Sequence, residues 1–477
     1  MTRLHRMSRG IGLCLVVALA SGAGACVFPD AFDEISTDCI DPKFDAATRA
    51  SFCSGEVSSR VVDETAGPEV AARPLVEARG GVITTLEQTG GNAFKLRVIG
   101  GGESQIFPFT LPTQGALTSF AVMGLSANSV AEESATIAMV YDAQEVRFVP
   151  LAEAVGGSSS REATPYVDDA SAPGLARQSG CDASAGEDFV LTDMAAMDSA
   201  TVQDRRYLMV AARCALVVYA QHEDRELATE PFVLAQYQIQ AHDIEIDRAS
   251  DKIYIASGLN GLQVRSLSAF ERELDDLLDD AYGVALSAAP GGGNNDDPDH
   301  TGEGPAREDG LVFTPQQRPA GDHYIDDPVK RVSINVVGVS FSDDRIFYLN
   351  GPTSDSGSDG GTYLVSGVLT DDGVLVDRQS IQIAGPAGDK RFEWGLVGLG
   401  DSMAMVLGNE FTQVGDQEAI TSRLVLFDAP RGQAAVAVHE IPVTTGVSAI
   451  APLAGELLVV QPDRLTAYDI SLRGGHL

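Results

Sequence analysis

The chain has 477 residues, with 68 acidic against 33 basic side chains and a formal net charge of −35. This charge argues against nucleic-acid binding, which needs a basic surface that neutralises phosphates. A hydrophobic content of 44% argues against disorder, and 49 glycines with 22 prolines favour many strands and turns over long helices.

The first 25 residues are predicted to be an export signal. Three arginines precede an uncharged apolar run over 11–20, which is too short to span a bilayer, and small residues then lead to Cys26. The segment resembles a bacterial lipoprotein signal, in which such a cysteine is lipidated and becomes the new N-terminus. Ala23 departs from this pattern, because these signals usually carry Leu three places before the cysteine. The alternative is ordinary cleavage after the A-x-A sequence at 23–25.

The signal sets the expected location of the protein. The resemblance implies a lipid anchor at Cys26 and, because Val27 follows instead of Asp, the outer membrane or cell surface. Without lipidation we expect a periplasmic protein. No later run approaches the roughly 18 apolar residues of a membrane span. Removal of residues 1–25 leaves 68 acids against 30 bases, a net charge near −38.

The cysteine count fits an oxidising compartment. Cys14 leaves with the signal, and lipidation of Cys26 leaves four other cysteines, an even number that suits two disulfides. Those four are Cys39, Cys53, Cys181 and Cys214. Their pairing stays open, and no CxxC or Cys/His spacing indicates a zinc or redox site. We expect residues 26–79 to be a tether that carries one of these disulfides.

From residue 80 the chain repeats one pattern, an apolar strand followed by a turn and a second apolar strand. Seven such pairs start 45 to 93 residues apart, and four of the six intervals match the size of a four-stranded blade. The pairs are 82–86 with 94–98, 137–140 with 146–149, 208–210 with 216–219, 253–255 with 262–264, 346–349 with 363–365, 403–406 with 424–427, and 457–460 with 465–468.

A third strand precedes several pairs, as at 242–247, 332–341 and 447–453. Short turns between successive strands are typical of the up-and-down blades of a β-propeller. We therefore predict an all-β fold, a seven-bladed propeller of four-stranded blades over 80–477. We expect a strand from 54–79 to close the ring against the C-terminal blade, with Leu75-Val76 as the candidate. The alternative is a pair of β-sandwiches.

Two segments carry a family resemblance. The sequence HDIEIDRASDKIYIASGLNGLQVRSLS from 242 and GELLVVQPDRLTAYDIS at 455–471 are similar to the LVIVD-type propeller repeats of secreted bacterial proteins. The resemblance implies the fold and not the chemistry, because propellers include enzymes, adhesins and scaffolds.

An insertion over about 268–325 interrupts the repeats. Apolar residues at helical spacing predict an amphipathic helix over 268–282 on the rim of the propeller, with Ser268 and Glu271 as a capping box. The following 289–323 is rich in Gly, Pro and Asp and is predicted to be a solvated loop. We expect most of the acidic excess here and in the turns, outside the strands.

In two acidic segments, the spacing of the oxygen-bearing residues is compatible with binding of a metal ion. Four oxygen-bearing residues and Gly302 fall at positions 1, 3, 5, 6 and 12 of an EF-hand-like loop, but the flanking residues do not form entering helices. The four are Asp297, Asp299, Thr301 and Glu308. The turn at 355–360 is similarly acidic. We expect both to be solvated loops with no cofactor, and calcium is the alternative.

The histidine with a suggestive position is His242, which precedes Asp243 at the start of a predicted inner strand. Propeller enzymes place their ligands at the mouth of the central channel, where such a pair can act as a base or bind a metal. The simpler interpretation is a hydrogen bond to the neighbouring blade. No G-x-S-x-G, phosphate loop or H-E-x-x-H occurs.

We therefore expect a binding or scaffold module, not an enzyme, at the cell envelope. Its partner would be an unidentified envelope protein or ligand, with contact to the membrane through the N-terminal lipid. The alternatives are a metal-dependent, lactonase-like hydrolase with its site at the channel mouth, or an adhesin. Several inner-strand Asp, Glu, Asn or His side chains at one end of the channel would favour the hydrolase.

Overall fold

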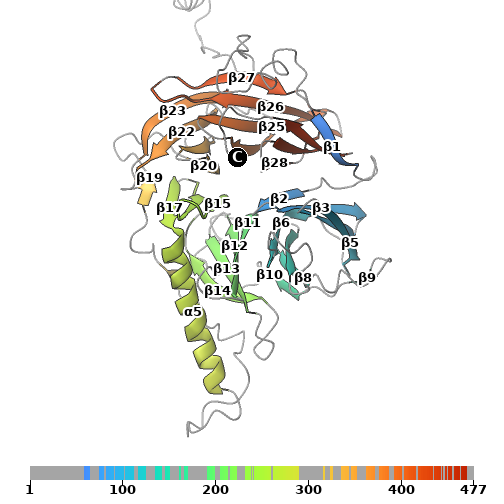
Figure 1. Cartoon of the computed structure of the whole chain (residues 1–477), viewed down its shortest axis with the longest axis vertical. Helices are drawn as coiled ribbons and strands as arrows, with labels where there is room; N and C mark the ends of the chain where they lie inside the picture. Colours follow the sequence, from blue (N-terminus) through green and yellow to red (C-terminus); the bar gives the residue numbers. More distant parts are fainter. Residues whose placement is uncertain are drawn as a thin grey trace, which may run out of the picture.

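The computed structural model shows seven small sheets arranged in a ring, a seven-bladed β-propeller (Figure 1). Within each sheet the first four strands are antiparallel, as expected for up-and-down blades. The structure describes residues 59–64, 75–79, 82–90, 92–100, 103–111, 117–124, 135–141, 145–150, 161–162, 166–169, 191–198, 205–212, 215–222, 231–237, 239, 241–258, 261–288, 315–316, 323–325, 335–342, 345–351, 361–370, 375–385, 391–399, 402–414, 417–432, 434–441, 443, 446–447, 449–453, 456–461 and 464–469.

We number the blades 1 to 7 in chain order and give their strands from the inside outwards. Blade 1 contains β2 (Leu75–Arg79), β3 (Val82–Gly90), β4 (Ala93–Gly100), β5 (Glu103–Thr110) and β9 (Arg161–Glu162). Blade 2 contains β6 (Leu117–Met123), β7 (Thr136–Tyr141), β8 (Glu145–Pro150) and β10 (Tyr166–Asp169). Blade 3 contains β11 (Leu191–Asp198), β12 (Arg205–Ala212), β13 (Ala215–His222), β14 (Phe232–Tyr237) and β18 (Pro315–Gln316).

The remaining four blades follow the same order. Blade 4 contains β15 (Asp243–Asp247), β16 (Lys252–Ala256), β17 (Leu262–Ser266) and β19 (His323–Ile325). Blade 5 contains β20 (Val336–Ser342), β21 (Arg345–Asn350), β22 (Thr362–Leu369) and β23 (Leu375–Ala384), and blade 6 contains β24 (Arg391–Gly398), β25 (Met403–Val414), β26 (Gln417–Asp428) and β27 (Val436–Ile441). Blade 7 contains β28 (Ala449–Leu453), β29 (Glu456–Val460), β30 (Arg464–Asp469) and β1 (Ser59–Glu64).

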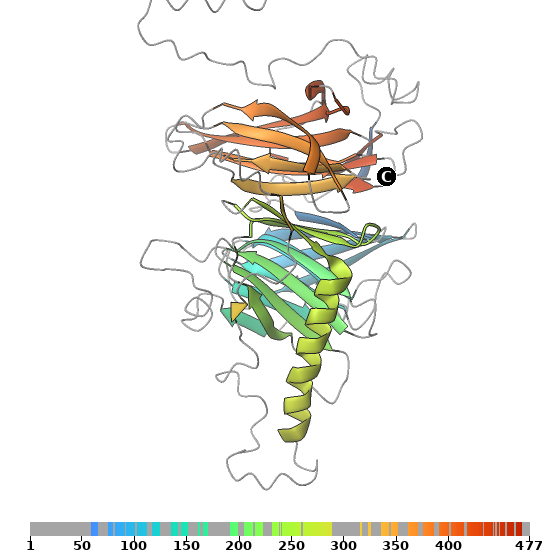
Figure 2. The same ribbon diagram turned by 90° about the vertical axis from the view of Figure 1, so that its left-hand side faces the viewer.

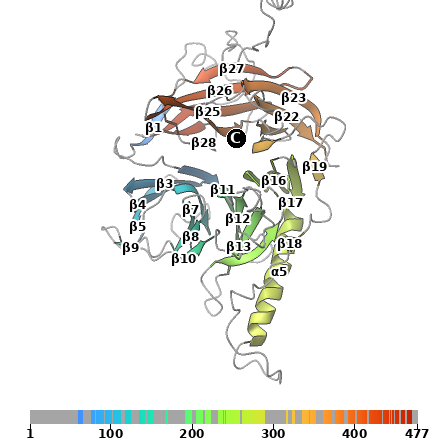
Figure 3. The ribbon, with the colours of Figure 1, turned by 180° about the vertical axis from the view of Figure 1, so that it is seen from behind.

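All seven predicted strand pairs are present, and each forms the central hairpin of one blade. The first strands of the blades contact one another around the ring, from β2 through β6, β11, β15, β20, β24 and β28 back to β2. Seen from either side, these inner strands lie around the middle of the molecule and strands such as β27 lie outside (Figures 1 and 3). Apolar side chains fill the spaces between blades, as in the cluster shared by blades 2 and 3.

An N-terminal strand from within 54–79 closes the ring against the C-terminal blade, as predicted, but it is not Leu75-Val76. Leu75 and Val76 pair with Leu86 and Thr85 and belong to the inner strand of blade 1. The strand that closes the ring is instead β1, which pairs antiparallel with β30. The propeller therefore begins before residue 80, and an N-terminal strand completes the C-terminal blade.

Two blades have a fifth strand where four were expected. β9 pairs parallel to β5, and β18 pairs parallel to β14, with two residues each. Both short strands come from later in the chain than the blade that they join. They cover part of an outer edge that would otherwise offer unpaired backbone groups.

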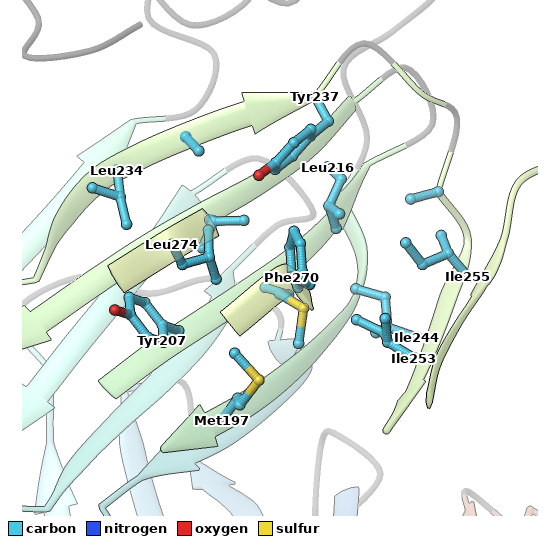
Figure 4. Packing of buried hydrophobic residues seen from close by; sticks show 14 of the residues in the cluster. Met197, Tyr207, Leu216, Leu234, Tyr237, Ile244, Ile253, Ile255, Phe270 and Leu274 are labelled. Atoms are coloured by element: carbon cyan, nitrogen blue, oxygen red, sulfur yellow. The ribbon is translucent and has the colours of Figure 1, made fainter. Parts of the chain in front are cut away.

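The predicted helix is present as α5 (Leu267–Ala288), and it packs on the outside of blades 3 and 4 (Figure 2). Its apolar face joins the core between these two blades. Figure 4 shows the side chains of this cluster, among them Phe270, Leu274, Met197, Tyr207, Leu216, Ile253 and Ile255. The buried residues Phe270, Leu274 and Leu278 confirm the spacing seen in the sequence.

The start of α5 differs from the predicted capping box. Ser266, and not Ser268, accepts a hydrogen bond from the third residue along, with 3.2 Å between its Oγ and Ala269 N. Asp251 holds the first turn from outside, because its carboxylate accepts from Ser268 N at 2.7 Å and from the hydroxyls of Ser266 and Ser268. The cap therefore comes from the turn between β15 and β16, which a purely local motif does not show.

Candidate functional site at the inner strands

Several residues predicted to have a function lie outside the described part of the chain. These are the export signal, Cys14, Cys26, Cys39, Cys53, Cys181, Cys214, Asp297, Asp299, Thr301, Gly302, Glu308 and the turn at 355–360. Lipidation, the disulfides and ion binding by these loops therefore stay predictions.

The candidates His242 and Asp243 are at the start of an inner strand, as predicted. His242 is half-buried, and its backbone N–H donates to Ala256 O at 2.8 Å, next to the first rung of β15 and β16. The Asp243 carboxylate accepts from Val339 N at 2.8 Å, which belongs to the inner strand of the next blade. Asp243 therefore links blades 4 and 5, whereas the hydrogen bond to a neighbouring blade that the simpler interpretation assigns to His242 stays a prediction.

A second aspartate meets Asp243 from the preceding blade. Asp193 on β11 accepts a hydrogen bond from Ile244 N at 3.1 Å, and Asp243 Oδ1 lies 3.0 Å from the same nitrogen. Burial, followed by the negative charge of Asp243, holds the pKa of Asp193 well above its usual value. Burial also raises the pKa of Asp243, while hydrogen bonds from Val339 N, Asp193 and Ile244 N oppose the rise.

Glu245 is the third acidic side chain of this group. It lies two residues after Asp243, so both point to the same side of β15, the side facing β20. Burial, and then repulsion from Asp243 and Asp247, raise the pKa of Glu245 to about 8. Three side chains, those of Asp193, Asp243 and Glu245, are partly exposed. Burial is nevertheless the largest cause of the rise in the pKa of each, because protein atoms surround them closely.

The hydrogen bonds of Asp193 and Asp243 are part of a repeated arrangement. At four junctions, an inner-strand side chain accepts the backbone N–H of the next blade's inner strand. The pairs are Glu77 with Val122 N at 3.0 Å, Asp193 with Ile244 N at 3.1 Å, Asp243 with Val339 N at 2.8 Å, and Ser340 with Gly398 N at 3.0 Å. Inner strands have an unpaired edge, and these acceptors satisfy part of it.

The described residues limit the chemistry of this site. Among them, no group of three or more His, Cys, Asp or Glu side chains is placed to hold a metal ion. Nor does the described part of the chain contain a helix long and apolar enough to cross a bilayer. What the inner strands offer is a set of acidic groups with raised pKa values, suited to proton exchange or to hydrogen bonding.

Of the three acids in this group, the sequence alone identified Asp243, and it did not identify Asp193 or Glu245. The alternating sequence of 243–247 places three acids on one side of a strand, a signal that could have identified Glu245. Asp193 lies 50 residues before Asp243, and only the contact between β11 and β15 brings them together.

The comparisons add no relative. No protein-family model matches the chain, and no curated protein is significantly similar to it. The site and the fold therefore carry the functional argument.

Proposed function

We propose that the protein is an exported, lipid-anchored β-propeller that serves as a binding or scaffold module at the cell envelope. One observation carries the choice of binding over catalysis. The inner-strand acids Asp193 and Asp243, which a propeller hydrolase would use for chemistry, accept backbone hydrogen bonds that hold neighbouring blades together. These contacts give the acids a structural role.

The position of β1 supports anchoring through the N-terminus. Cys26 precedes Ser59, the first residue of β1, by 33 residues, and such a chain spans at most about 110 Å. Because β1 pairs with β30, a force on the N-terminus acts directly on the strand that closes the ring. A lipid at Cys26 would thus hold the whole propeller near the membrane.

Exposed apolar side chains on the rim support a binding role. Ile106, Val376 and Val436 are each more than 40% exposed, and they lie on β5, β23 and β27, the fourth strands of their blades. Scattered exposed residues are ordinary on any protein. Their common position on outer strands nevertheless makes the rim the first surface to probe.

The anchor is tested by labelling cells with an alkynyl fatty acid and analysing the mature N-terminus by mass spectrometry. We expect label on wild type and none on Cys26→Ser. An unmodified mature N-terminus in wild type would refute the anchor.

Binding is tested with photo-crosslinking residues at 376 and 436 in intact cells, and with a matched control at the exposed Asp276 of α5. We expect a discrete crosslinked species from the rim positions and none from the control. Identical patterns at all three positions would contradict a rim interface.

The alternative of a hydrolase has one specific observation in its favour. The raised pKa of Glu245, about 8, suits a general acid or base near neutral pH. Purified protein should be assayed against ester and lactone substrates beside Glu245→Gln. Turnover by wild type that is lost in this variant would establish the hydrolase and refute a purely binding role.

A further inference from the structure

We propose that Asp193 and Asp243 share one proton and form a pH-sensitive lock that holds the inner strands of blades 3, 4 and 5 together. The inference concerns the stability of the ring and is independent of the proposed binding function.

The geometry makes the two carboxyl groups close neighbours. Each has a carboxyl oxygen within 3.1 Å of one backbone nitrogen, Ile244 N, which places the two carboxyl groups side by side. Two ionised carboxylates in such an enclosed place repel strongly, whereas a carboxylic acid and a carboxylate form a strong hydrogen bond. One proton between them is therefore the favourable state.

Both aspartates accept backbone N–H groups, and the larger rise in pKa indicates which of them holds the proton. The two oxygens of Asp243 face two N–H donors, Ile244 N at 3.0 Å and Val339 N at 2.8 Å, and this favours its ionised form. The pKa of Asp193 is held well above its usual value although it too has backbone donors, Met194 N and Ile244 N, so we assign the proton to Asp193, which donates it to Asp243. This chain of contacts joins β11, β15 and β20.

The other ionisable groups around the two aspartates either add negative charge when they ionise or lie farther along their strands. Glu245 lies beside Asp243 and adds negative charge there only above its pKa of about 8, and Asp247 lies beyond it on the same strand. The described β20 and β6 have no ionisable side chain. His242 is next to Asp243 in the sequence. On β16, Tyr254 and Lys252 lie beyond Ala256, the residue paired with Asp243. On β12, Tyr207, Arg206 and Arg205 lie beyond Ala211, the residue paired with Asp193.

Loss of the proton to solvent base breaks the lock. The Asp193–Asp243 hydrogen bond disappears, two adjacent anions remain, and their repulsion pushes β11 away from β15. Because the folded protein binds the proton more tightly than the unfolded chain, stability falls as pH rises through the pKa of Asp193. The lock is therefore closed below the raised pKa of Asp193 and weakened above it.

The test compares the purified mature protein with Asp193→Asn, which cannot ionise and keeps one donor and one acceptor. The matched control is Asp276→Asn, an exposed position on α5. Melting temperatures are measured from pH 5 to 9.5. We expect wild type and the control to lose about 2–4 °C more than Asp193→Asn over this range.

Hydrogen exchange gives a local readout. Between pH 6 and 9, after correction for intrinsic rates, peptides that cover 243–247 and 336–342 should lose protection roughly tenfold more in wild type than in Asp193→Asn. A peptide from the β25–β26 hairpin is the internal reference. Equal pH profiles for the two proteins in both experiments would overturn the proposal. If Asp193→Asn does not fold, Asp243→Asn removes the same repulsion and makes the same comparison.

Discussion

Replacement of Glu245 by Gln is expected to stabilise the protein at alkaline pH, although it removes a charged side chain. The pKa of Glu245 in the folded protein is about 8, against an ordinary value of 4.5. Between these values the unfolded chain ionises while the folded protein keeps its proton, so the folded state loses stability as pH rises. Below pH 4.5 both states are protonated and the effect vanishes.

The size of the effect follows from the shift. A difference of about 3.5 pH units corresponds to at most about 4–5 kcal/mol at pH 8.5. Glu245 is only half-buried and its surroundings can relax, so a gain of about 1–3 kcal/mol is a realistic expectation. Gln has the shape of the protonated acid and leaves the contacts of β15 in place.

The assay is urea unfolding at pH 5 and pH 8.5, with the denaturant slope checked for constancy. Glu393→Gln is the matched control, an exposed glutamate on the inner strand β24. We expect Glu245→Gln to gain stability over wild type at pH 8.5 and much less at pH 5. A gain of equal size at both pH values, or a loss at pH 8.5, would show that ionisation of Glu245 does not govern the difference.

Three further predictions test the packing and the closure. Leu274→Ala should lower the free energy of unfolding by about 2–5 kcal/mol because Leu274 is fully buried between blades 3 and 4, while the exposed Asp276→Ala should change it by less than about 0.5 kcal/mol in the same urea titration. In thermal melts, Gly124→Ala should lower the melting temperature more than Gly432→Ala. Both glycines have positive φ, but only at Gly124 would a Cβ collide with an arginine side chain. Equal losses in melting temperature would contradict this account. Deletion of residues 59–64 should make the C-terminal blade the first site of limited proteolysis, since β30 then has a free edge; unchanged cleavage kinetics would refute closure by β1.

The sequence was informative where the structure depends on local patterns. The seven hairpins could be predicted because each consists of two apolar strands near in sequence, with turns between them. The helix could be predicted because its buried residues follow helical spacing. Within 54–79, the closing strand was assigned to Leu75-Val76 instead of Ser59–Glu64. This short strand pairs with β30, about 400 residues away in sequence, and its own letters, SRVVDE, contain a single apolar pair.

The acidic side chains show a different limit of sequence reasoning. Our expectation assigned the negative charge to loops and turns, yet Glu77, Asp193 and Asp243 are on inner strands and accept backbone N–H groups of the next blade. A propeller must satisfy the free edge of each inner strand, and an acid on the neighbouring strand does so by accepting a hydrogen bond from it. Such an acid looks like a catalytic candidate in the sequence because both roles need the same residue type at the same position. In Asp243 each carboxyl oxygen has a backbone donor, and its structural role therefore takes precedence. The rise in the pKa of Glu245 has no hydrogen bond among its causes. Glu245 is thus the acid of this group that is best suited to chemistry.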